Sequence, residues 1–574
     1  MKTILNRILS VFSIHVMALA TIVSCTEKDS PENAGNSGAG IPEGNVEIRI
    51  MADRETVLFR NPLSGWVIYA PLMDDVDAFW EAYDNFQSSE GSVRVSDYAT
   101  VLYLRGSWTD FNPEEDVYIW QDGVDTPQAR SLRKLEEGAM ERDLKLAFTL
   151  KTDSRDANAN CTPEYVRRKM IEAYGGDGTR GYFSFTLGTN PPRQYWSPYP
   201  DDPVFQECYS RFINALADEY DDAERTMFIS GLGMGKWGEY HTCIYSTCAN
   251  DDPSDDEAPR EAVFEWVTDL YAEAFTEVPV FTNYHKLVGC TIGEGSASSQ
   301  PERCAISERL LAGAIAKGFS MRHDAFGMRA ETFGYASWEK DFIADWTYKV
   351  PVIGEGGWIV TQGGYNDKGE PTNYLTQYSG PRELRAGEYE DMKSAYVNMM
   401  DLRYDASYIK GETWSWFNDA YDLVVKFLKE DCYRVYPDRV TFPAEMKSGK
   451  KYTVQHRWLN LGHAYCPTNI RQYEGRFKVA FAVTDAETGK IVGDNIFFDE
   501  NARPHDWTGG RSSYMLDITP DDIPAGEYCM CVGIVDMALG NPDEGDFRIG
   551  IHIAAQGEFT GDGWLRLGKI RISE

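Results

Sequence analysis

The chain has 574 residues, of which 90 are Asp or Glu and 56 are Lys or Arg, so its formal net charge at pH 7 is −34. An excess of acidic groups this large argues against nucleic acid and anionic membrane surfaces as partners, because the phosphate backbone rewards basic surfaces. Neutral ligands remain candidates. Aromatic residues make up 13% of the chain, and their rings suit stacking against the apolar faces of ligands, although any single Trp is better explained by core packing.

The N-terminus has the pattern of a bacterial lipoprotein signal peptide. Lys2 and Arg7 give a positive start, residues 8–23 form an apolar run, and Ile22-Val23-Ser24-Cys25 resembles a lipobox, in which the Cys is lipidated after cleavage. A membrane-spanning anchor is the alternative, but the run is shorter than the roughly 20 apolar residues required and is interrupted by Ser13.

Four segments follow from this reading of the chain. Residues 1–24 are the expected signal peptide, and 25–44, rich in Ser, Glu, Asn, Gly and Pro, are expected to be a flexible tether. Residues 45–430 are expected to form a catalytic barrel and 431–574 a β-sandwich. Lipidation at Cys25 then predicts a protein attached to the bacterial outer membrane, facing the periplasm or the cell surface.

Apolar runs of strand length alternate with helical patterns in the first large segment. The runs are rich in Val, Ile, Tyr and Phe and mostly lack polar alternation, as expected for strands buried on both faces. Thr162 before Pro163, and Asp202 before Pro203, are helix-start signals. The alternation predicts an α/β fold with a closed (β/α)8 barrel; an open doubly wound sheet is the alternative, but it would show a Gly-rich phosphate turn after its first strand. The expected strands are 65–72, 99–108, 144–153, 225–233, 278–285, 319–326, 350–356 and 406–416.

The pattern changes at about residue 431. Short alternating runs are separated by turn clusters such as Asp485-Ala486-Glu487-Thr488-Gly489, which predicts an all-β, antiparallel sandwich. Such a domain can bind carbohydrate, but a purely structural role is the better expectation, because fold alone does not fix function.

Two glutamates stand at the ends of buried runs. Glu239 follows the run 225–233 in Gly235-Lys236-Trp237-Gly238-Glu239-Tyr240, and Glu355 lies in the run 350–356. A (β/α)8 barrel keeps its active site at the carboxyl ends of its strands, and two carboxylates facing one cleft are the minimum equipment for hydrolysing a glycosidic bond. The alternative is that one or both glutamates only pair with arginines at the barrel rim.

This arrangement resembles the clan A retaining glycoside hydrolases, a (β/α)8 superfamily that includes many β-galactosidases, cellulases and mannanases. The resemblance implies that Glu239, ending strand four, is the general acid/base and that Glu355, ending strand seven, is the nucleophile. It implies that Arg105, ending strand two, lies beside the nucleophile, and that Trp414 or Trp416, ending strand eight, forms an aromatic floor under the sugar.

The chain departs from the clan pattern at Gly238, because members usually carry Asn there, where it bonds the sugar 2-hydroxyl. Asn283, ending strand five, is a candidate replacement. His323 and Asp324 end strand six and either assist substrate and nucleophile or form a buried ion pair. Further substrate-binding candidates are Trp66 on strand one, Glu412 as a substitute carboxylate, and Trp196, which either walls a glycan subsite or caps the barrel.

The chemistry requires the two glutamates to differ in protonation. Arg105 beside Glu355 would lower the pKa of that nucleophile, whereas the apolar neighbours Trp237 and Tyr240 would raise the pKa of Glu239.

The sequence therefore predicts an enzyme, a retaining glycoside hydrolase acting on an extracytoplasmic poly- or oligosaccharide. The alternatives are a non-catalytic surface glycan-binding lipoprotein on a barrel scaffold, and a scaffold lipoprotein whose sandwich binds a protein. No cofactor and no metal are expected, because the chain shows no nucleotide loop and His241 lies beside Cys243 and Cys248 without further ligand spacing. The pairs Cys243/Cys248 and Cys290/Cys304 are close enough in sequence for disulfides, although spacing does not establish pairing.

Overall fold

The computed structural model describes most of the chain after the predicted tether. Residues 44–574 form one compact unit. Within the described residues, no helix combines the length and hydrophobicity needed to cross a bilayer. The predicted signal peptide, Cys25 and nearly all of the predicted tether lie outside the described residues. The described ranges are 42–153, 160–176, 180–185, 193–240, 243–248, 258–285, 301–328, 335–356, 378, 380–403, 411–541 and 545–574.

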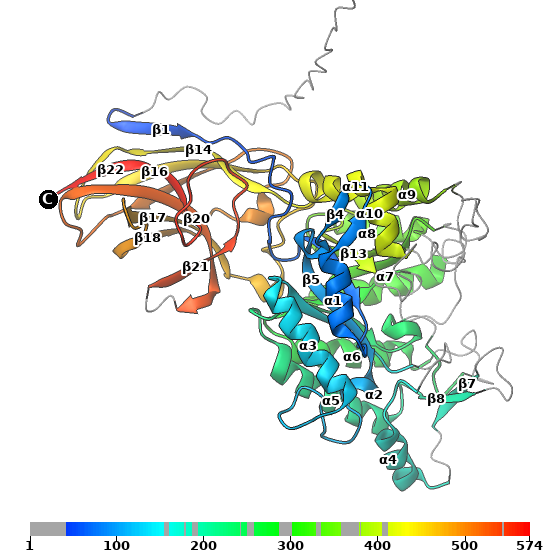
Figure 1. The fold of residues 1–574 in the computed structure, drawn as a ribbon. Coiled ribbons are helices and arrows are strands. Elements are labelled where there is room, and N and C mark those ends of the chain that lie inside the picture. Colours follow the sequence, from blue (N-terminus) through cyan, green and yellow to red (C-terminus); the bar gives the residue numbers. More distant parts are fainter. Residues whose placement is uncertain are drawn as a thin grey trace, which may run out of the picture. The chain divides into compact units, whose positions relative to one another are not determined.

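A closed barrel of parallel strands forms the first domain, which confirms the predicted fold class (Figure 1). Each strand pairs in parallel with its neighbours in chain order, and the last, β13, closes the barrel by pairing with the first, β2. The strands are β2 (Gly65–Ala70), β5 (Ala99–Ser107), β6 (Lys145–Lys151), β9 (Thr226–Gly233), β10 (Val280–Asn283), β11 (Ser320–Phe326), β12 (Val352–Gly356) and β13 (Met399–Arg403).

The predicted eighth strand is wrong. The strand that closes the barrel is Met399–Arg403, not 406–416. Within the predicted run, residues 404–410 lie outside the described residues and Glu412 begins the helix α10 (Glu412–Asp419). The real strand carries Asp401 and Arg403 inside the barrel, and these charges interrupt the apolar run by which buried strands are recognised.

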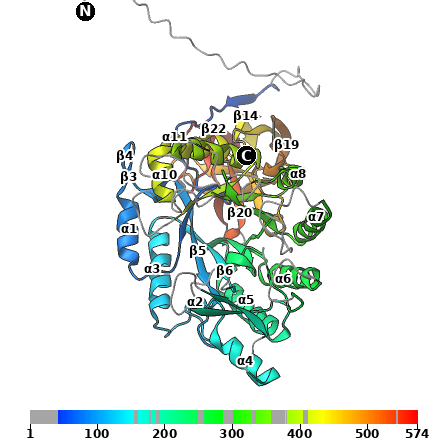
Figure 2. The same ribbon diagram turned by 90° about the vertical axis from the view of Figure 1, so that its right-hand side faces the viewer.

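Helices lie around the outside of the strands (Figure 2). The predicted start at Asp202 is confirmed, because its side chain accepts hydrogen bonds from the backbone N–H groups of Val204 and Phe205. Thr162 does not cap its helix; its hydroxyl donates to the carbonyl of Thr152. The helices are α1 (Val76–Asp84), α2 (Trp108–Phe111), α3 (Pro127–Glu141), α4 (Glu164–Tyr174), α5 (Pro203–Tyr220), α6 (Arg260–Ala274), α7 (Pro301–Ala316), α8 (Ser337–Asp345), α9 (Pro381–Ser394), α10 and α11 (Tyr421–Lys426).

Two packed sheets form the second, strand-rich domain. One is ordered β1-β14-β16-β19, and the other β15-β22-β20-β17-β18 with β21 paired to β20. All pairs are antiparallel except β15 with β22. The strands are β1 (Asn45–Arg49), β14 (Val435–Pro443), β15 (Glu445–Lys447), β16 (Tyr452–Asn460), β17 (Phe477–Asp485), β18 (Ile491–Asp499), β19 (Ser512–Ile518), β20 (Gly526–Asn541), β21 (Asp546–Ile551) and β22 (Leu565–Ser573). Two hairpins, β3 (Phe86–Ser88) with β4 (Gly91–Val93) and β7 (Gly181–Phe185) with β8 (Gln194–Pro198), lie among the loops that follow barrel strands.

Strand β1 differs from the expected domain boundary. Residues 45–49 were expected to open the barrel domain, but β1 pairs with β14 in the sandwich. Val46 and Ile48 pack against the sandwich core, and these alternating apolar positions give the strand its buried face.

One hydrophobic cluster joins the two domains. It includes the inward side chains Val67, Val101 and Phe281 of barrel strands together with Trp458 and Val479 of the two sheets. The sandwich core therefore continues into the barrel interior, and the polar inward residues are confined to the carboxyl ends of the strands, where barrel active sites lie.

Candidate active site

Charged side chains fill the carboxyl end of the barrel interior. Arg105 lies on β5, Arg322 and Asp324 on β11, and Asp401 and Arg403 on β13. Successive residues of a strand point to opposite faces, so the spacing of two within β11 and β13 places each pair on the same inward face.

Glu355 occupies the position predicted for it, and Glu239 does not end its strand. Glu355 is the penultimate residue of β12, whereas β9 ends at Gly233 and Glu239 follows in a short turn. That turn has left-handed backbone at Trp237 (φ 57°) and Gly238 (φ 79°). A Cβ at Gly238 would lie 2.0 Å from the carbonyl oxygen of Leu150. No side chain fits there, which explains why this chain lacks the Asn of the family that it resembles.

Two neighbours fix the main chain around Glu239. Arg105 donates from Nη2 to the carbonyl of Trp237 at 2.7 Å, and Asn283 donates from Nδ2 to the carbonyl of Glu239 at 3.2 Å. Asn283 also accepts from the backbone N–H of His285 at 3.2 Å. Its amide is therefore used in holding the turn, so the prediction that it replaces the missing sugar ligand lacks a structural basis.

The carboxyl groups of Glu239, Asp324 and Glu355 come together. One oxygen from each lies within 4.8 Å of the others. Sequence reasoning predicted this approach for Glu239 and Glu355, and the geometry confirms it. Three carboxylates at this spacing can hold a cation in other settings, but the guanidinium groups around them already supply the positive charge.

Three arginines bind the two glutamates. Arg105 lies 2.6 Å from Glu239 and 3.6 Å from Glu355. Arg322 lies 3.0 Å from Glu239 and also contacts Glu355, and Arg403 lies 3.1 Å from Glu355. Both glutamate side chains are only 1% exposed. The arginine predicted beside the nucleophile is thus closer to Glu239, and two further arginines were not anticipated.

The surroundings separate the carboxyl groups by protonation. Burial acts to raise the pKa of Glu355, but the guanidinium groups of Arg322, Arg105 and Arg403 outweigh it and hold this pKa below its usual value. Burial, together with the negative charges of Glu239 and Glu355, raises the pKa of Asp324 to about 7. Asp324 is therefore the carboxyl of this group that keeps a proton close to neutral pH.

A second acid on β13 stands behind this group. Burial raises the pKa of Asp401 to about 6, and Asp401 accepts from Nε of Arg403 at 3.0 Å and from the backbone N–H of Gly356 at 3.0 Å. It thereby orients the arginine that binds Glu355.

Several residues predicted to bind substrate lie in the helical layer. Trp66 points outward from β2 and packs edge to face on Trp416 at 4.9 Å, and both are buried. Glu412 on α10 binds Arg385 of α9. Trp414 lies on the same helix, partly buried. The predicted aromatic floor at the end of strand eight is therefore wrong for both tryptophans.

Trp196 and His323 also differ from their predicted positions. Trp196 on β8 is 3% exposed, so it is a packing residue and not an exposed platform. His323 points away from the barrel interior toward α8, where its Nε2 lies 3.1 Å from Glu339. Its neighbour Asp324 faces the glutamates, as the alternation along β11 requires.

Arg322, Asp401 and Arg403 are the site residues that sequence reasoning missed. Their signal is the spacing of two between charged residues, Arg322 with Asp324 and Asp401 with Arg403. Charged residues at alternate positions of an otherwise apolar strand in a barrel indicate a polar interior at that level.

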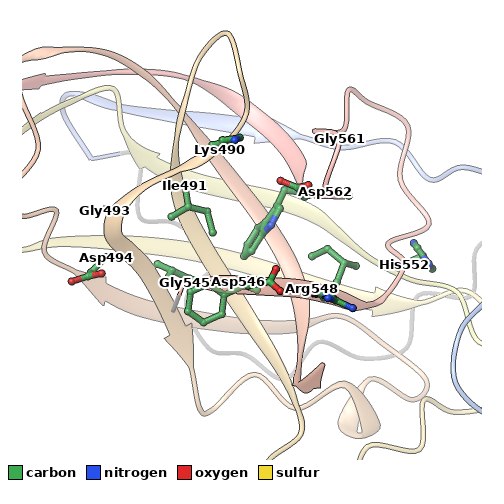
Figure 3. A pocket seen from close by; sticks show the side chains of 15 residues that line it. Lys490, Ile491, Gly493, Asp494, Gly545, Asp546, Arg548, His552, Gly561 and Asp562 are labelled. Atoms are coloured by element: carbon green, nitrogen blue, oxygen red, sulfur yellow. Dashed lines mark ion pairs between the residues drawn. The ribbon is translucent and has the colours of Figure 1, made fainter. Parts of the chain in front are cut away.

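Two cavities of different kinds are present in the described part of the chain. One of about 180 Å³ adjoins the barrel mouth and is lined by Arg105, Gly106, Asp74, Asp110 and Lys151 among others. A larger one, about 1250 Å³, is lined only by sandwich residues, with acidic and basic side chains around it, and contains none of the clustered carboxylates (Figure 3). The smaller cavity is the one connected with the carboxylate cluster.

The sequence matches no family model and none of the curated proteins. Among solved structures, the chain is similar to endo-glycoceramidase II from Rhodococcus sp., at 11% identity over 79% of this chain and 97% of that one, with a TM-score of 0.34. It is also similar to the exo-beta-1,4-mannosidase Op5Man5 from Opitutaceae bacterium strain TAV5, at 12% identity over 69% and 64% of the chains, with a TM-score of 0.35. Morphinone reductase matches at 13% identity over 58% of this chain and 82% of that one, with a TM-score of 0.31. Likenesses this distant, to two glycosidases and a reductase, do not assign an activity.

Proposed function

We propose that this protein is a glycoside hydrolase that cleaves a poly- or oligosaccharide outside the cytoplasm with net retention of anomeric configuration. The observation that carries the proposal is the convergence of Glu239, Asp324 and Glu355 within 4.8 Å at the carboxyl end of the barrel. Retaining enzymes hold their two carboxyl groups about 5 to 5.5 Å apart, whereas inverting enzymes need about 6.5 to 9.5 Å to admit a water molecule. The separation here favours retention.

Glu355 is the proposed nucleophile. A nucleophile must be ionised to attack the anomeric carbon, and the lowered pKa of Glu355 meets this requirement. Arg322, Arg105 and Arg403 keep the carboxylate charged and also fix its orientation, because each of them contacts one of its two oxygens.

Glu239 is the proposed acid/base, and Asp324 is the proposed proton reservoir beside it. The contacts with Arg105 and Arg322 favour the ionised form of Glu239 when no substrate is bound. The carboxyl groups of Asp324 and Glu239 are close enough to titrate as a coupled group, and the raised pKa of Asp324 places the proton there near neutral pH. The proton reaches the leaving oxygen through Glu239 in this proposal.

A non-catalytic glycan-binding protein is the second candidate function. It is favoured by the 1% exposure of both glutamates and by their pairing with three arginines, which is the arrangement expected of an ion-pair network without turnover. Attachment to the outer membrane through Cys25 is part of both proposals and rests on the N-terminal sequence alone.

Hydrolysis of a glycan panel by wild type and four variants tests the proposal. We expect Glu355→Gln and Glu239→Gln each to abolish release of sugars and Asp324→Asn to shift the pH profile. Asp536→Asn is the matched control, because Asp536 forms an equally buried pair with Arg476 in the sandwich. With aryl glycosides, azide should rescue Glu355→Ala to a glycosyl azide of inverted configuration. Near-normal turnover by either glutamate variant, or glycan binding without hydrolysis by the wild type, would refute the catalytic assignment.

A further inference from the structure

Two histidines and a glutamate form a buried cluster behind the barrel wall. His285 follows β10, His323 lies on β11 and Glu339 on α8. Their side chains are 2%, 0% and 1% exposed. Because His323 stands between the inward residues Arg322 and Asp324, its ring projects into the layer between strands and helices. The cluster is therefore separate from the carboxylates of the proposed active site.

The donor atoms of the cluster are spaced like ligands of one metal ion. His285 Nδ1 lies 3.2 Å from Glu339 Oε1, and His323 Nε2 lies 3.1 Å from Glu339 Oε2. The two ring nitrogens are 3.3 Å apart. Ligands bound at about 2.0 to 2.1 Å from a tetrahedral zinc ion lie about 3.3 to 3.4 Å from one another. The three observed separations agree with that geometry within a few tenths of an ångström.

Hydrogen bonds alone satisfy this triangle poorly. If both ring nitrogens donate to the glutamate, two N–H groups face each other across 3.3 Å. If one ring nitrogen is deprotonated, it directs a lone pair at the negative carboxylate. A divalent cation removes both conflicts, because two neutral imidazoles and a carboxylate all offer lone pairs to it.

The surroundings hold the ligands in position. Glu339 Oε2 accepts the backbone N–H of Ala336 at 2.8 Å, which fixes the carboxylate at the start of α8. The ring of His323 stacks on Phe326 at 4.4 Å and meets Tyr335 edge to face at 4.7 Å. Such an apolar shell excludes water and strengthens binding of the ion by its ligands.

We propose that His285, His323 and Glu339 bind one zinc ion that fastens β10, β11 and α8 to one another. The donor set of two imidazole nitrogens and a carboxylate suits zinc, and the fourth ligand lies outside this trio. The ion would stabilise β11, the strand that carries Arg322 and Asp324, so it acts on the proposed active site only through the position of that strand.

Metal analysis of the purified full chain tests this proposal independently of catalysis. We expect about one zinc ion per chain in the wild type, measured by inductively coupled plasma mass spectrometry, and almost none in His323→Ala or Glu339→Gln. His552→Gln, which changes an exposed histidine of the sandwich, is the control and should keep its zinc.

Thermal unfolding supplies a second readout that does not depend on folding of the variants. Chelation should lower the unfolding temperature of the wild type, and added zinc should restore it, because binding to the folded state alone stabilises it. Glu339→Gln should respond to neither treatment. A wild type that holds no zinc and whose unfolding temperature is unchanged by chelator and by zinc would overturn the proposal and leave a hydrogen-bonded trio.

Discussion

Replacement of Arg322 by Met removes the cation that contacts both glutamates. Arg322 is fully buried, lies 3.0 Å from Glu239 and contacts Glu355. Met is similar in length, so the change removes charge and hydrogen bonds more than volume. Breaking a buried ion pair from one side costs about 3 to 5 kcal/mol, because it leaves an uncompensated charge in a medium of low polarity. We expect a loss of this size in the free energy of unfolding at pH 7.

The loss should depend on pH in a defined direction. Arg322 is the strongest of the charges that lower the pKa of Glu355 against its burial. A carboxyl group whose pKa is lowered by folding contributes stability above its unfolded pKa of about 4.3, and this contribution disappears as the pH falls through the folded pKa. The difference between wild type and Arg322→Met should therefore be greatest near neutral pH and shrink below about pH 4.

Urea unfolding followed by tryptophan fluorescence measures this prediction. Arg49→Met is the matched control, because Arg49 is 76% exposed and pairs with Glu47 at the surface, and it should change stability by less than about 0.5 kcal/mol. Adding Glu355→Gln to Arg322→Met should recover at least about 1 kcal/mol if the two residues are coupled. A cost below about 1 kcal/mol for Arg322→Met, or no recovery in the double variant, would refute the reasoning.

Three further predictions concern packing and protonation. Trp416→Ala removes a buried indole and should lower the free energy of unfolding in urea by about 3 to 5 kcal/mol; a loss below about 1 kcal/mol would contradict the packing. The pKa of Asp324, raised by burial to about 7, should make stability fall as the pH rises from about 4 to 7, and Asp324→Asn should abolish that part of the fall; identical pH curves of the unfolding midpoint would contradict it. Gly138→Ala would place Cβ 2.0 Å from Trp80 Nε1 and should cost about 1 to 3 kcal/mol, whereas Gly313→Ala, with open space around it, should stabilise its helix by about 0.5 to 1 kcal/mol in the same assay.

The barrel could be predicted from sequence because most of its strands are apolar on both faces. The exception is β13, whose inward residues are Asp401 and Arg403. These charges are compensated by each other at 3.0 Å and by Glu355 at 3.1 Å, and such pairing across strands is invisible to a local pattern. The aromatic run at 411–416 was mistaken for the strand because a buried helix face and a buried strand are equally apolar.

The proposed site was predictable in its carboxylates and not in its arginines. Glu239 and Glu355 could be brought together by one rule, that the carboxyl ends of barrel strands meet. Which arginine reaches which glutamate depends on strand register and side-chain direction, and Arg105 illustrates this, because it lies closer to Glu239 than to Glu355. The His285, His323 and Glu339 cluster gave no signal either, since its members are 38 and 16 positions apart, outside the spacing of short metal motifs.

The pairing of β1 with β14 constrains the order in which the molecule assembles. Asn45 lies opposite Pro443, so β1 leaves the ribosome about 400 residues before its partner does, and the whole barrel is synthesised in the interval. The early strand waits with an unpaired edge, and its charged Glu47 and Arg49 discourage pairing with another chain. Completion of the sandwich is therefore a late step, and a chain interrupted after the barrel would leave this edge exposed to quality-control proteases.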